Sequence, residues 1–268
     1  MKKSYLYLFL IAALALFSCE KVVDLDLDES EQQYVIEGIV HDSLGDNFVL
    51  VSKSQYFNNQ NPFQQITNAS VQIIDNFNNT YNLYQTKPGY YTDSTLQGVA
   101  NRTYTLIVNV DGKQVVAQST MPPRVELDSL SLEEEIFSEE SDGKQKYRVD
   151  CHFTDPLGLG NYYRFKGFEV IENELEQVDG FLSISDDYID GLDTYFPFFD
   201  GSFFEGDSVV IQFLSIDEAN YRYFTAIELS QQGEVPGNPV TNLVGDNVVG
   251  YFGAYAKSQR SIIITPEP

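Results

Sequence analysis

The chain has 268 residues, of which 40 are acidic and 16 are basic, so its formal net charge at neutral pH is −24. A surface this acidic repels nucleic acid and anionic lipid headgroups, and it favours cations or basic partners. The chain has two cysteines and two histidines, a supply of thiols and imidazoles that is too poor for a four-ligand zinc site.

Residues 1–18 have the layout of a bacterial lipoprotein signal peptide. Two lysines precede an apolar run over residues 4–17, which is too short to span a bilayer. The run ends at Leu16-Phe17-Ser18-Cys19, the Leu-x-small-Cys pattern in which the cysteine receives a diacylglycerol and the chain is cut just before it. We therefore predict lipidation at Cys19, with two or three acyl chains as a lasting anchor. The alternative is an ordinary signal peptide with an incidental cysteine.

Residues 19–33 alternate acids with few groups that can pack, so we expect an acidic tether between the lipid and the folded part. Asp24 and Asp28 belong to an alternating Asp-Leu run, so the alternative is a short edge strand. With Cys19 acylated, Cys151 is the remaining thiol. Its place in an alternating strand pattern predicts an inert, buried core residue.

Residues 34–122 are predicted to form an antiparallel β-sandwich. Short β-branched and aromatic runs, such as residues 34–40 and 48–52, alternate with turn sequences about every ten residues. Asp111-Gly112, between two alternating runs, is the strongest hairpin signal in the chain. Two prolines at residues 122–123 end this run of strands.

Residues 124–268 are predicted to form a second β-sandwich. Acidic loops are expected over residues 133–142 and 186–200. Strands over residues 248–255 and 261–265 are expected to close the second sheet.

One amphipathic helix is predicted within the second sandwich, over residues 215–232. Ser215 and Glu218 fit a capping box at its start, and Gly233 can supply a left-handed stop. Strands followed by a single helix indicate a mainly β fold with two sandwich domains, not βαβ units.

The spacing of the histidines does not favour catalysis. His41-Asp42-Ser43 contains the residue types of a hydrolase triad, but consecutive strand residues point to opposite faces. The same alternation separates the Cys151 thiol from His152. We therefore expect a protein that is not an enzyme. A carboxylate- or calcium-dependent hydrolase is the least favoured alternative.

The densest carboxylate cluster surrounds a glycine turn at Asp190-Gly191, and hard cations such as calcium prefer such oxygen ligands. The spacing does not fit an EF-hand, because Tyr188 and Pro197 stand at ligand positions. The expectation is a chain without a cofactor, with calcium as the cation that this cluster would take. The alternative to a metal site is a solvated hairpin loop. The candidate ligands are Asp186, Asp187, Asp190 and Asp193.

Aromatic side chains crowd an acidic, glycine-containing segment after this turn. Exposed aromatics with an acidic rim are typical of a protein-binding patch. The alternative is that these rings close the end of the second sandwich. In the first sandwich, the pair Tyr56-Phe57 in an Asn/Gln-rich loop is a second candidate contact site, with the same alternative. The candidate partner-binding residues are Tyr195, Phe196, Phe198, Phe199, Phe203, Phe204, Tyr56 and Phe57.

Several short motifs follow the lipidation motif in a fixed order. They include Gly89-Tyr90-Tyr91, Met121-Pro122, Phe153-Thr154-Asp155-Pro156, Gly206-Asp207-Ser208-Val209 and Gly250-Tyr251-Phe252. In this order they resemble the Bacteroidota lipoproteins grouped as domain of unknown function 4249. The resemblance covers nearly the whole mature chain. It implies an outer-membrane lipoprotein, commonly encoded beside a TonB-dependent transporter, and it supplies no catalytic residues. The first domain also resembles prealbumin-like, carboxypeptidase-regulatory and Ig-like sandwich modules.

We therefore expect a non-enzymatic, surface-exposed outer-membrane lipoprotein that assists a TonB-dependent transporter in ligand capture or uptake. Its partners would be the membrane, through the lipid on Cys19, and the transporter, whereas nucleic acid is not expected. The alternative is a structural or adhesive surface lipoprotein.

Overall fold

The computed structural model describes residues 32–55, 63–135, 145–231 and 239–265, which belong to one unit. The predicted signal peptide, the lipidation site at Cys19 and nearly all of the predicted tether lie outside the described residues. No helix within the described ranges is long and apolar enough to cross a membrane.

Strands with alternating buried and exposed side chains form the first half of the fold. Asp111 and Gly112 connect two of them with positive φ angles of 48° and 76°, the conformation that a two-residue hairpin turn of this type requires. The predicted hairpin is therefore confirmed. The strands are β1 (Tyr34–His41), β2 (Phe48–Lys53), β3 (Gln64–Gln65), β4 (Ser70–Asp75), β5 (Thr80–Lys87), β6 (Tyr90–Thr92), β7 (Thr103–Val110) and β8 (Lys113–Thr120).

The second half contains longer strands and one helix. Its strands belong to two sheets that enclose a separate core. The elements are β9 (Ser129–Glu135), β10 (Lys146–Thr154), β11 (Tyr162–Ile171), β12 (Glu174–Ser185), β13 (Asp193–Phe204), β14 (Ser208–Ile216), α2 (Glu218–Gln231), β15 (Leu243–Val244) and β16 (Val248–Ile263).

The strands are arranged in two sheets, which confirms the predicted mainly β fold. The larger sheet has 13 strands and follows the order β12-β11-β14-β16-β1-β2-β6-β5-β4-β7-β8-β15, with β3 paired to β2. The smaller sheet has the order β13-β10-β9. One pair, β1 with β16, is parallel, whereas the prediction had antiparallel pairs alone.

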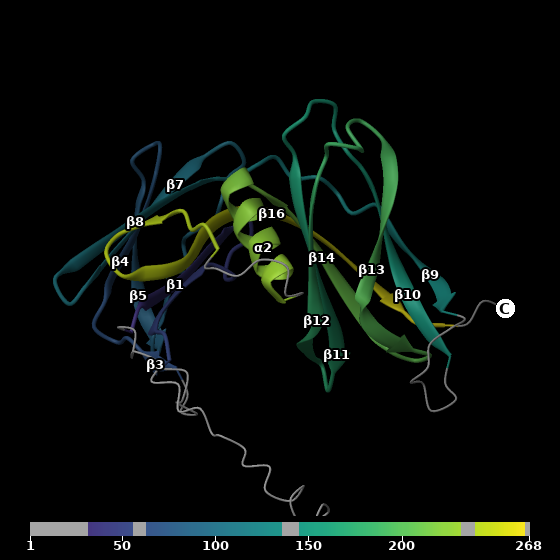
Figure 1. The fold of residues 1–268 in the computed structure, drawn as a ribbon, viewed down its shortest axis with the longest axis horizontal. Coiled ribbons are helices and arrows are strands. Elements are labelled where there is room, and N and C mark those ends of the chain that lie inside the picture. Colours follow the sequence, from purple (N-terminus) through teal and green to yellow (C-terminus); the bar gives the residue numbers. More distant parts are fainter. Residues whose placement is uncertain (1–31, 56–62, 136–144, 232–238, 266–268) are drawn as a thin grey trace, which may run out of the picture. The chain divides into compact units, whose positions relative to one another are not determined.

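Strand β16 connects the two halves of the chain. Its first half pairs with β1, from Val248 opposite Tyr34 to Tyr255 opposite His41, and its second half pairs with β14. Figure 1 shows β16 as the long yellow strand that extends from β1 toward β14. The expectation that residues 248–255 close the second sheet was wrong, because a strand of 16 residues is long enough to reach both halves.

Two large clusters of buried side chains correspond to the two halves. The first core draws on β1, β2 and β4 to β8, and it also receives Phe252 and Ala254 from β16. The second core lies between the three-stranded sheet and strands β11, β12 and β14. Its rings pack closely: Phe213 lies 4.7 Å from both Phe153 and Phe165, measured between ring centroids. Aromatic packing of this kind accounts for much of the stability of a β core.

The N-cap of helix α2 lies two residues later in the chain than predicted. The Asp217 carboxylate accepts a hydrogen bond from the Asn220 N–H at 2.9 Å, so Asp217 is the N-cap. The predicted cap, Ser215, is still part of β14, where its hydroxyl accepts a hydrogen bond from the Val125 N–H at 3.2 Å. The strand extends further than expected because Ile216 still pairs with Tyr162 of β11.

A third, smaller cluster lies beneath α2. It joins Ile39 of β1, Leu214 of β14 and Phe224 of the helix. The helix is thus held against the larger sheet in the region where β16 connects β1 to β14 (Figure 1).

Candidate functional site

The predicted aromatic patch is largely part of the second core. Phe198 and Phe203 of β13 are 1 % and 0 % exposed, which corrects the expectation that these two rings form a contact surface. They face inward because β13 pairs with β10 and an irregularity in that pairing, between Tyr147 and Val149, lets both rings point into the core. The predicted loop over residues 186–200 was therefore wrong from Asp193 onward, where β13 begins.

The other predicted aromatics are divided between core and surface. Phe196 is half-buried and stacks on Phe165, and Phe204 is also half-buried. Tyr195 is 53 % exposed and contacts the His152 ring at a centroid distance of 5.5 Å. The Phe199 side chain, together with Tyr56 and Phe57, lies outside the described residues. Among the described members, Tyr195 alone is strongly exposed.

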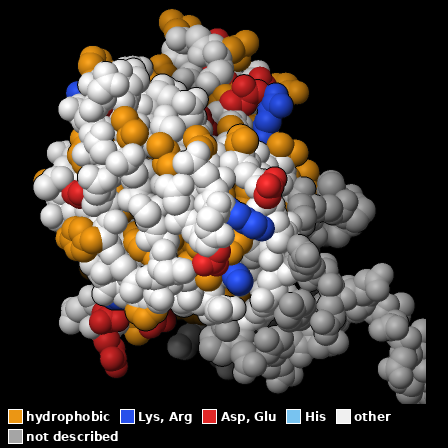
Figure 2. Space-filling model, turned by 90° about the vertical axis from the view of Figure 1, so that its left-hand side faces the viewer, with side chains coloured by type: hydrophobic (Ala, Val, Ile, Leu, Met, Phe, Trp, Pro, Cys, Tyr) orange, Lys and Arg blue, Asp and Glu red, His pale blue; other side chains and the backbone are white. Residues whose placement is uncertain are grey.

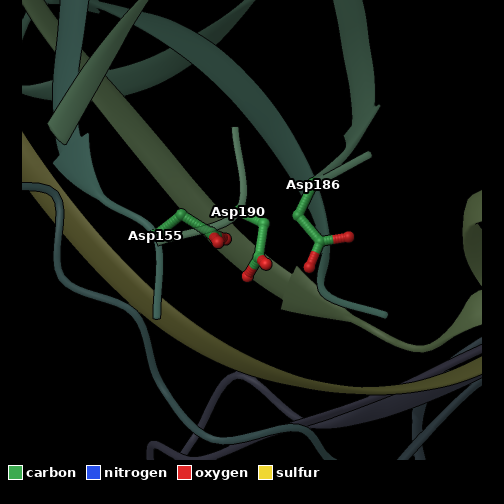
Figure 3. Close-up of side chains that lie close together, drawn as sticks. All are labelled: Asp155, Asp186 and Asp190. Carbon is green, nitrogen blue, oxygen red and sulfur yellow. The ribbon is translucent and has the colours of Figure 1, made fainter. Parts of the chain in front are cut away.

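The predicted acidic cluster is present in part. Asp186 and Asp190 lie with Asp155, whose carboxylate the sequence did not identify, and oxygens of the three lie within 4.8 Å of one another (Figure 3). Asp187 instead accepts a hydrogen bond from the Ser185 hydroxyl, and Asp193 accepts one from the Thr154 hydroxyl. The cluster joins two turns, one between β10 and β11 and one between β12 and β13.

Backbone N–H groups hold each of these carboxylates across the two turns. Asp186 accepts hydrogen bonds from the N–H groups of Gly160 and Asn161, both at 3.0 Å. Asp190 accepts one from the Gly158 N–H at 2.6 Å, and Asp155 accepts one from the Gly191 N–H at 3.0 Å. The arrangement latches the two turns together, and its oxygens also suit a hard cation. Calcium binding here stays a prediction.

The remaining hydroxyl partner of the cluster is Tyr163. Its O–H donates a hydrogen bond to Asp155, and burial together with this bond raises the pKa of Tyr163. The phenol therefore stays protonated at neutral pH and remains a hydrogen-bond donor to Asp155.

The surface over β4, β5 and β8 shows no clear candidate for another binding site among the described residues. Figure 2 shows this face, on which hydrophobic side chains are dispersed among uncharged polar ones and few acidic groups are visible. Dispersed apolar side chains are normal for a protein surface and do not mark a binding site.

The strongest candidate site is a cavity of about 420 Å³ beneath α2, called here the α2 pocket. Its lining comes from strands β1, β2, β11, β12, β14 and β16 and from the helix. Small-molecule sites have volumes of about 300–1,000 Å³, so the α2 pocket is large enough for a small ligand.

Strand alternation explains why this pocket mixes charged and apolar groups. On β1, Glu37, Ile39 and His41 line the pocket, while the residues between them face the first core. On β11, Arg164 and Lys166 line it, while their neighbours face the second core. The pocket thus lies on the sheet face opposite both sandwich cores. Phe224, Ile227 and Glu228 of α2 complete it.

Arg164 is held in place within the pocket. Its guanidinium lies 3.7 Å from the Glu228 carboxylate and 3.5 Å from the centroid of the Phe224 ring. It also donates a hydrogen bond to the Ser183 hydroxyl at 3.4 Å. These partners compensate a buried cation, although burial lowers the pKa of Arg164.

Lys166 and Glu37 are half-buried in the same pocket without such partners. In the described part of the chain, neither forms a hydrogen bond or an ion pair within 4.0 Å. Burial lowers the pKa of Lys166 and raises that of Glu37, while the opposite charge of each opposes the shift of the other. The ammonium group also lies 5.6 Å from the centroid of the Phe168 ring.

His41 is a further polar group of the α2 pocket. The residue is 8 % exposed, and its Nδ1 atom is buried without a hydrogen-bond partner. Burial and the positive charge of Lys257 lower the pKa of His41 to about 4, so its ring is neutral at neutral pH. No pattern in the sequence identified this histidine as a pocket residue, because the pocket forms from strands that are distant in the chain.

The geometry separates the residues of the apparent triad. The Asp42 carboxylate binds the Arg124 guanidinium at 2.7 Å, outside the α2 pocket, and the Ser43 hydroxyl donates to Asp46 at 3.0 Å. Cys151 and His152 likewise face opposite ways. The Cys151 thiol is buried, which raises its pKa to about 12, whereas His152 bonds the Ser131 hydroxyl at 2.7 Å.

The fold and the pocket define a mainly β protein with two sandwich cores and a small-molecule-sized cavity beneath its helix. The chain belongs to the family described as domain of unknown function DUF4249, whose sequence model matches residues 20–261. A search of curated proteins gave no match.

Two solved structures are similar over most of the chain. A cytokine receptor complex has 10 % identity and a TM-score of 0.27, and the match covers 87 % of this chain and 97 % of that one. A segment of two fibronectin type-III domains from chicken tenascin has 9 % identity and a TM-score of 0.25, with 87 % and 100 % covered. At such low identity and TM-score, neither structure bears on the function of this chain.

Proposed function

We propose that the protein is a non-enzymatic lipoprotein of the Bacteroidota outer membrane that captures a small ligand in the α2 pocket and passes it to a TonB-dependent transporter. The observation that carries the proposal is the pocket itself. It combines apolar walls with charged side chains that converge from separate strands, which is the composition of a ligand site.

Membrane attachment is the second element of the proposal. The Leu16–Cys19 motif directs lipidation to Cys19, and an anchor of two or three acyl chains holds a protein at a bilayer durably. The acidic segment that follows would keep the folded part away from anionic headgroups by charge repulsion, so that it can reach a neighbouring transporter at the cell surface.

Ligand capture is favoured over a purely adhesive role because of where the charges lie. Adhesion requires exposed contact groups, yet two of the predicted contact aromatics are buried in the second core. Lys166 and Glu37 instead line the α2 pocket, where half-burial of a charge is costly unless a ligand or a partner compensates it.

Co-purification from the native membrane tests the proposal. The full chain, extracted in mild detergent through its own anchor, is expected to bring a TonB-dependent transporter with it. The matched Cys19→Ala variant should be absent from the outer-membrane fraction and should recover no transporter. Repeated recovery of the anchored wild-type protein without any transporter would overturn the proposal.

A further inference from the structure

The α2 pocket holds two opposite charges that the described protein groups leave uncompensated at short range. Lys166 of β11 and Glu37 of β1 both line it, and neither has an ion pair or a hydrogen bond in the described residues. Half-buried charges without partners are unfavourable. A ligand that brings one negative and one positive group therefore gains two charge-assisted contacts on binding.

The charge balance of the pocket also favours a ligand without net charge. Arg164 is compensated by Glu228, and the charges of Lys166 and Glu37 cancel each other. Lys257, whose positive charge helps to lower the pKa of His41, forms an ion pair with the Asp46 carboxylate at 2.5 Å. An anion or a cation would leave one of the two unpartnered groups buried without compensation.

Apolar side chains form other parts of the pocket wall. Ile39, Phe48 and Leu214 from three strands face Phe224 and Ile227 from the helix. Phe48 is fixed by stacking on Tyr90 at a centroid distance of 5.0 Å. Apolar walls of this kind accommodate a hydrocarbon or aromatic side chain, and the volume of about 420 Å³ limits the ligand to a small molecule.

The buried Nδ1 atom of His41 points to a ligand as an independent observation. A buried polar atom without a partner is rare in proteins and costs free energy. Because His41 lines the α2 pocket, a rotation of its ring on ligand binding would bring this atom to a hydrogen-bonding group of the ligand. An amide or an amino group next to a carboxylate supplies such a partner.

We infer that the α2 pocket binds a small zwitterion with an apolar side chain, a free amino acid or a short peptide, with its carboxylate at Lys166 and its ammonium group at Glu37. This deepens the proposed function, because it names the class of ligand that the lipoprotein captures. The ligand's polar backbone lies toward His41, and its side chain lies between the strands and α2.

Calorimetric titration of the full lipoprotein in detergent tests this with four probes. L-phenylalanine and L-leucyl-L-leucine carry both charges, N-acetyl-L-phenylalanine lacks the ammonium group, and L-phenylalaninamide lacks the carboxylate. We expect at least one zwitterion to bind saturably. If it is L-phenylalanine, each derivative should bind about tenfold more weakly or worse, because each loses one charge-assisted contact.

Three variants assign the charges to their residues. Lys166→Met should weaken the zwitterion about tenfold or more and remove its advantage over L-phenylalaninamide. Glu37→Gln should likewise weaken binding of the zwitterion about tenfold or more, and it should remove the affinity difference between the zwitterion and N-acetyl-L-phenylalanine. Lys146→Met is the matched control, because Lys146 pairs with Glu135 on β9 and does not line the pocket; it should bind like the wild type.

Several results would overturn the inference. They are the absence of binding by both zwitterions, tighter binding of either single-charge derivative, and unchanged binding in both pocket variants. The probe series on the wild-type protein decides the question even where a variant fails to fold, and if only L-leucyl-L-leucine binds, its N-acetyl and C-terminal amide derivatives take the place of those of L-phenylalanine. Recovery of a transporter does not depend on these probes, so a pocket that rejects zwitterions refutes this inference while the proposed function stands on co-purification.

Discussion

Replacing Phe203 with alanine distinguishes a core role from a contact role for the aromatic segment of β13. The Phe203 ring is fully buried and lies 6.3 Å from that of Phe198, measured between centroids. Removing a fully buried phenylalanine ring costs about 3–5 kcal/mol of unfolding free energy, since burial is lost and a cavity remains. Tyr195 lies in the same segment but is more than half exposed, so Tyr195→Ala should cost about 0.5 kcal/mol or less.

Urea denaturation followed by circular dichroism measures this difference. With a slope of about 3 kcal/mol per molar urea, the Phe203→Ala midpoint should fall by about 1 M or more, while that of Tyr195→Ala stays within about 0.2 M of the wild type. A Phe203→Ala protein that unfolds at the wild-type midpoint would refute the core assignment. If that protein also failed to co-purify with the transporter that we propose as its partner, the ring would belong to a contact surface.

Three further changes test other parts of the structure. Acidification from pH 6.5 to pH 4 should lower the free energy of unfolding by about 3 kcal/mol through His41. The reason is that the pKa of His41 falls from 6.5 to about 4 on folding, so the unfolded state binds the extra proton in this range. Urea midpoints across this range should show a smaller loss for His41→Asn, and an equal loss in both proteins would contradict the assignment. Gly167→Ala should destabilise by about 1–3 kcal/mol, because a Cβ atom there lies 2.6 Å from the Phe198 ring; a wild-type melting temperature would argue against this contact. Asp186→Ala should cost about 1–3 kcal/mol by removing the acceptor of several N–H groups, and a rise of the wild-type melting temperature with CaCl₂ that this variant lacks would show that the three-carboxylate cluster binds the metal.

Local features of this fold could be predicted from the sequence. The hairpin at Asp111-Gly112 follows from turn chemistry and from the alternation on either side of it, both of which act within a few residues. The helix was found to within a few residues of each end, and its cap was misplaced because Asp217 and Ser215 are both good capping residues.

Long-range features could not be predicted in this way. Alternation assigns the residues of β1 and β11 to two faces, but it does not tell what covers each face. The parallel pairing of β1 with β16 brings opposite ends of the chain together, and the α2 pocket depends on that pairing. The sequence did not place Asp155 in the acidic cluster, because Asp155 lies far along the chain from Asp186 and only the folded structure brings the two together.

The sequence left open whether the rings of Phe198 and Phe203 are buried or form a contact surface, because of their neighbours in the chain. Acids and glycines beside an aromatic run suggest exposure, yet Gly167 on the adjacent sheet leaves the space that Phe198 fills. Close approach of a ring to a glycine is a property of two strands together, and no single segment encodes it.

A crystal structure of the described part of the chain, grown with the zwitterion that binds in the calorimetric titration, tests the central claim, ligand capture in the α2 pocket, most directly. We predict electron density for one such zwitterion beneath α2, with its carboxylate beside Lys166 and its amino group beside Glu37. A pocket that holds only solvent, at a zwitterion concentration that saturates the calorimetric signal, would contradict the claim.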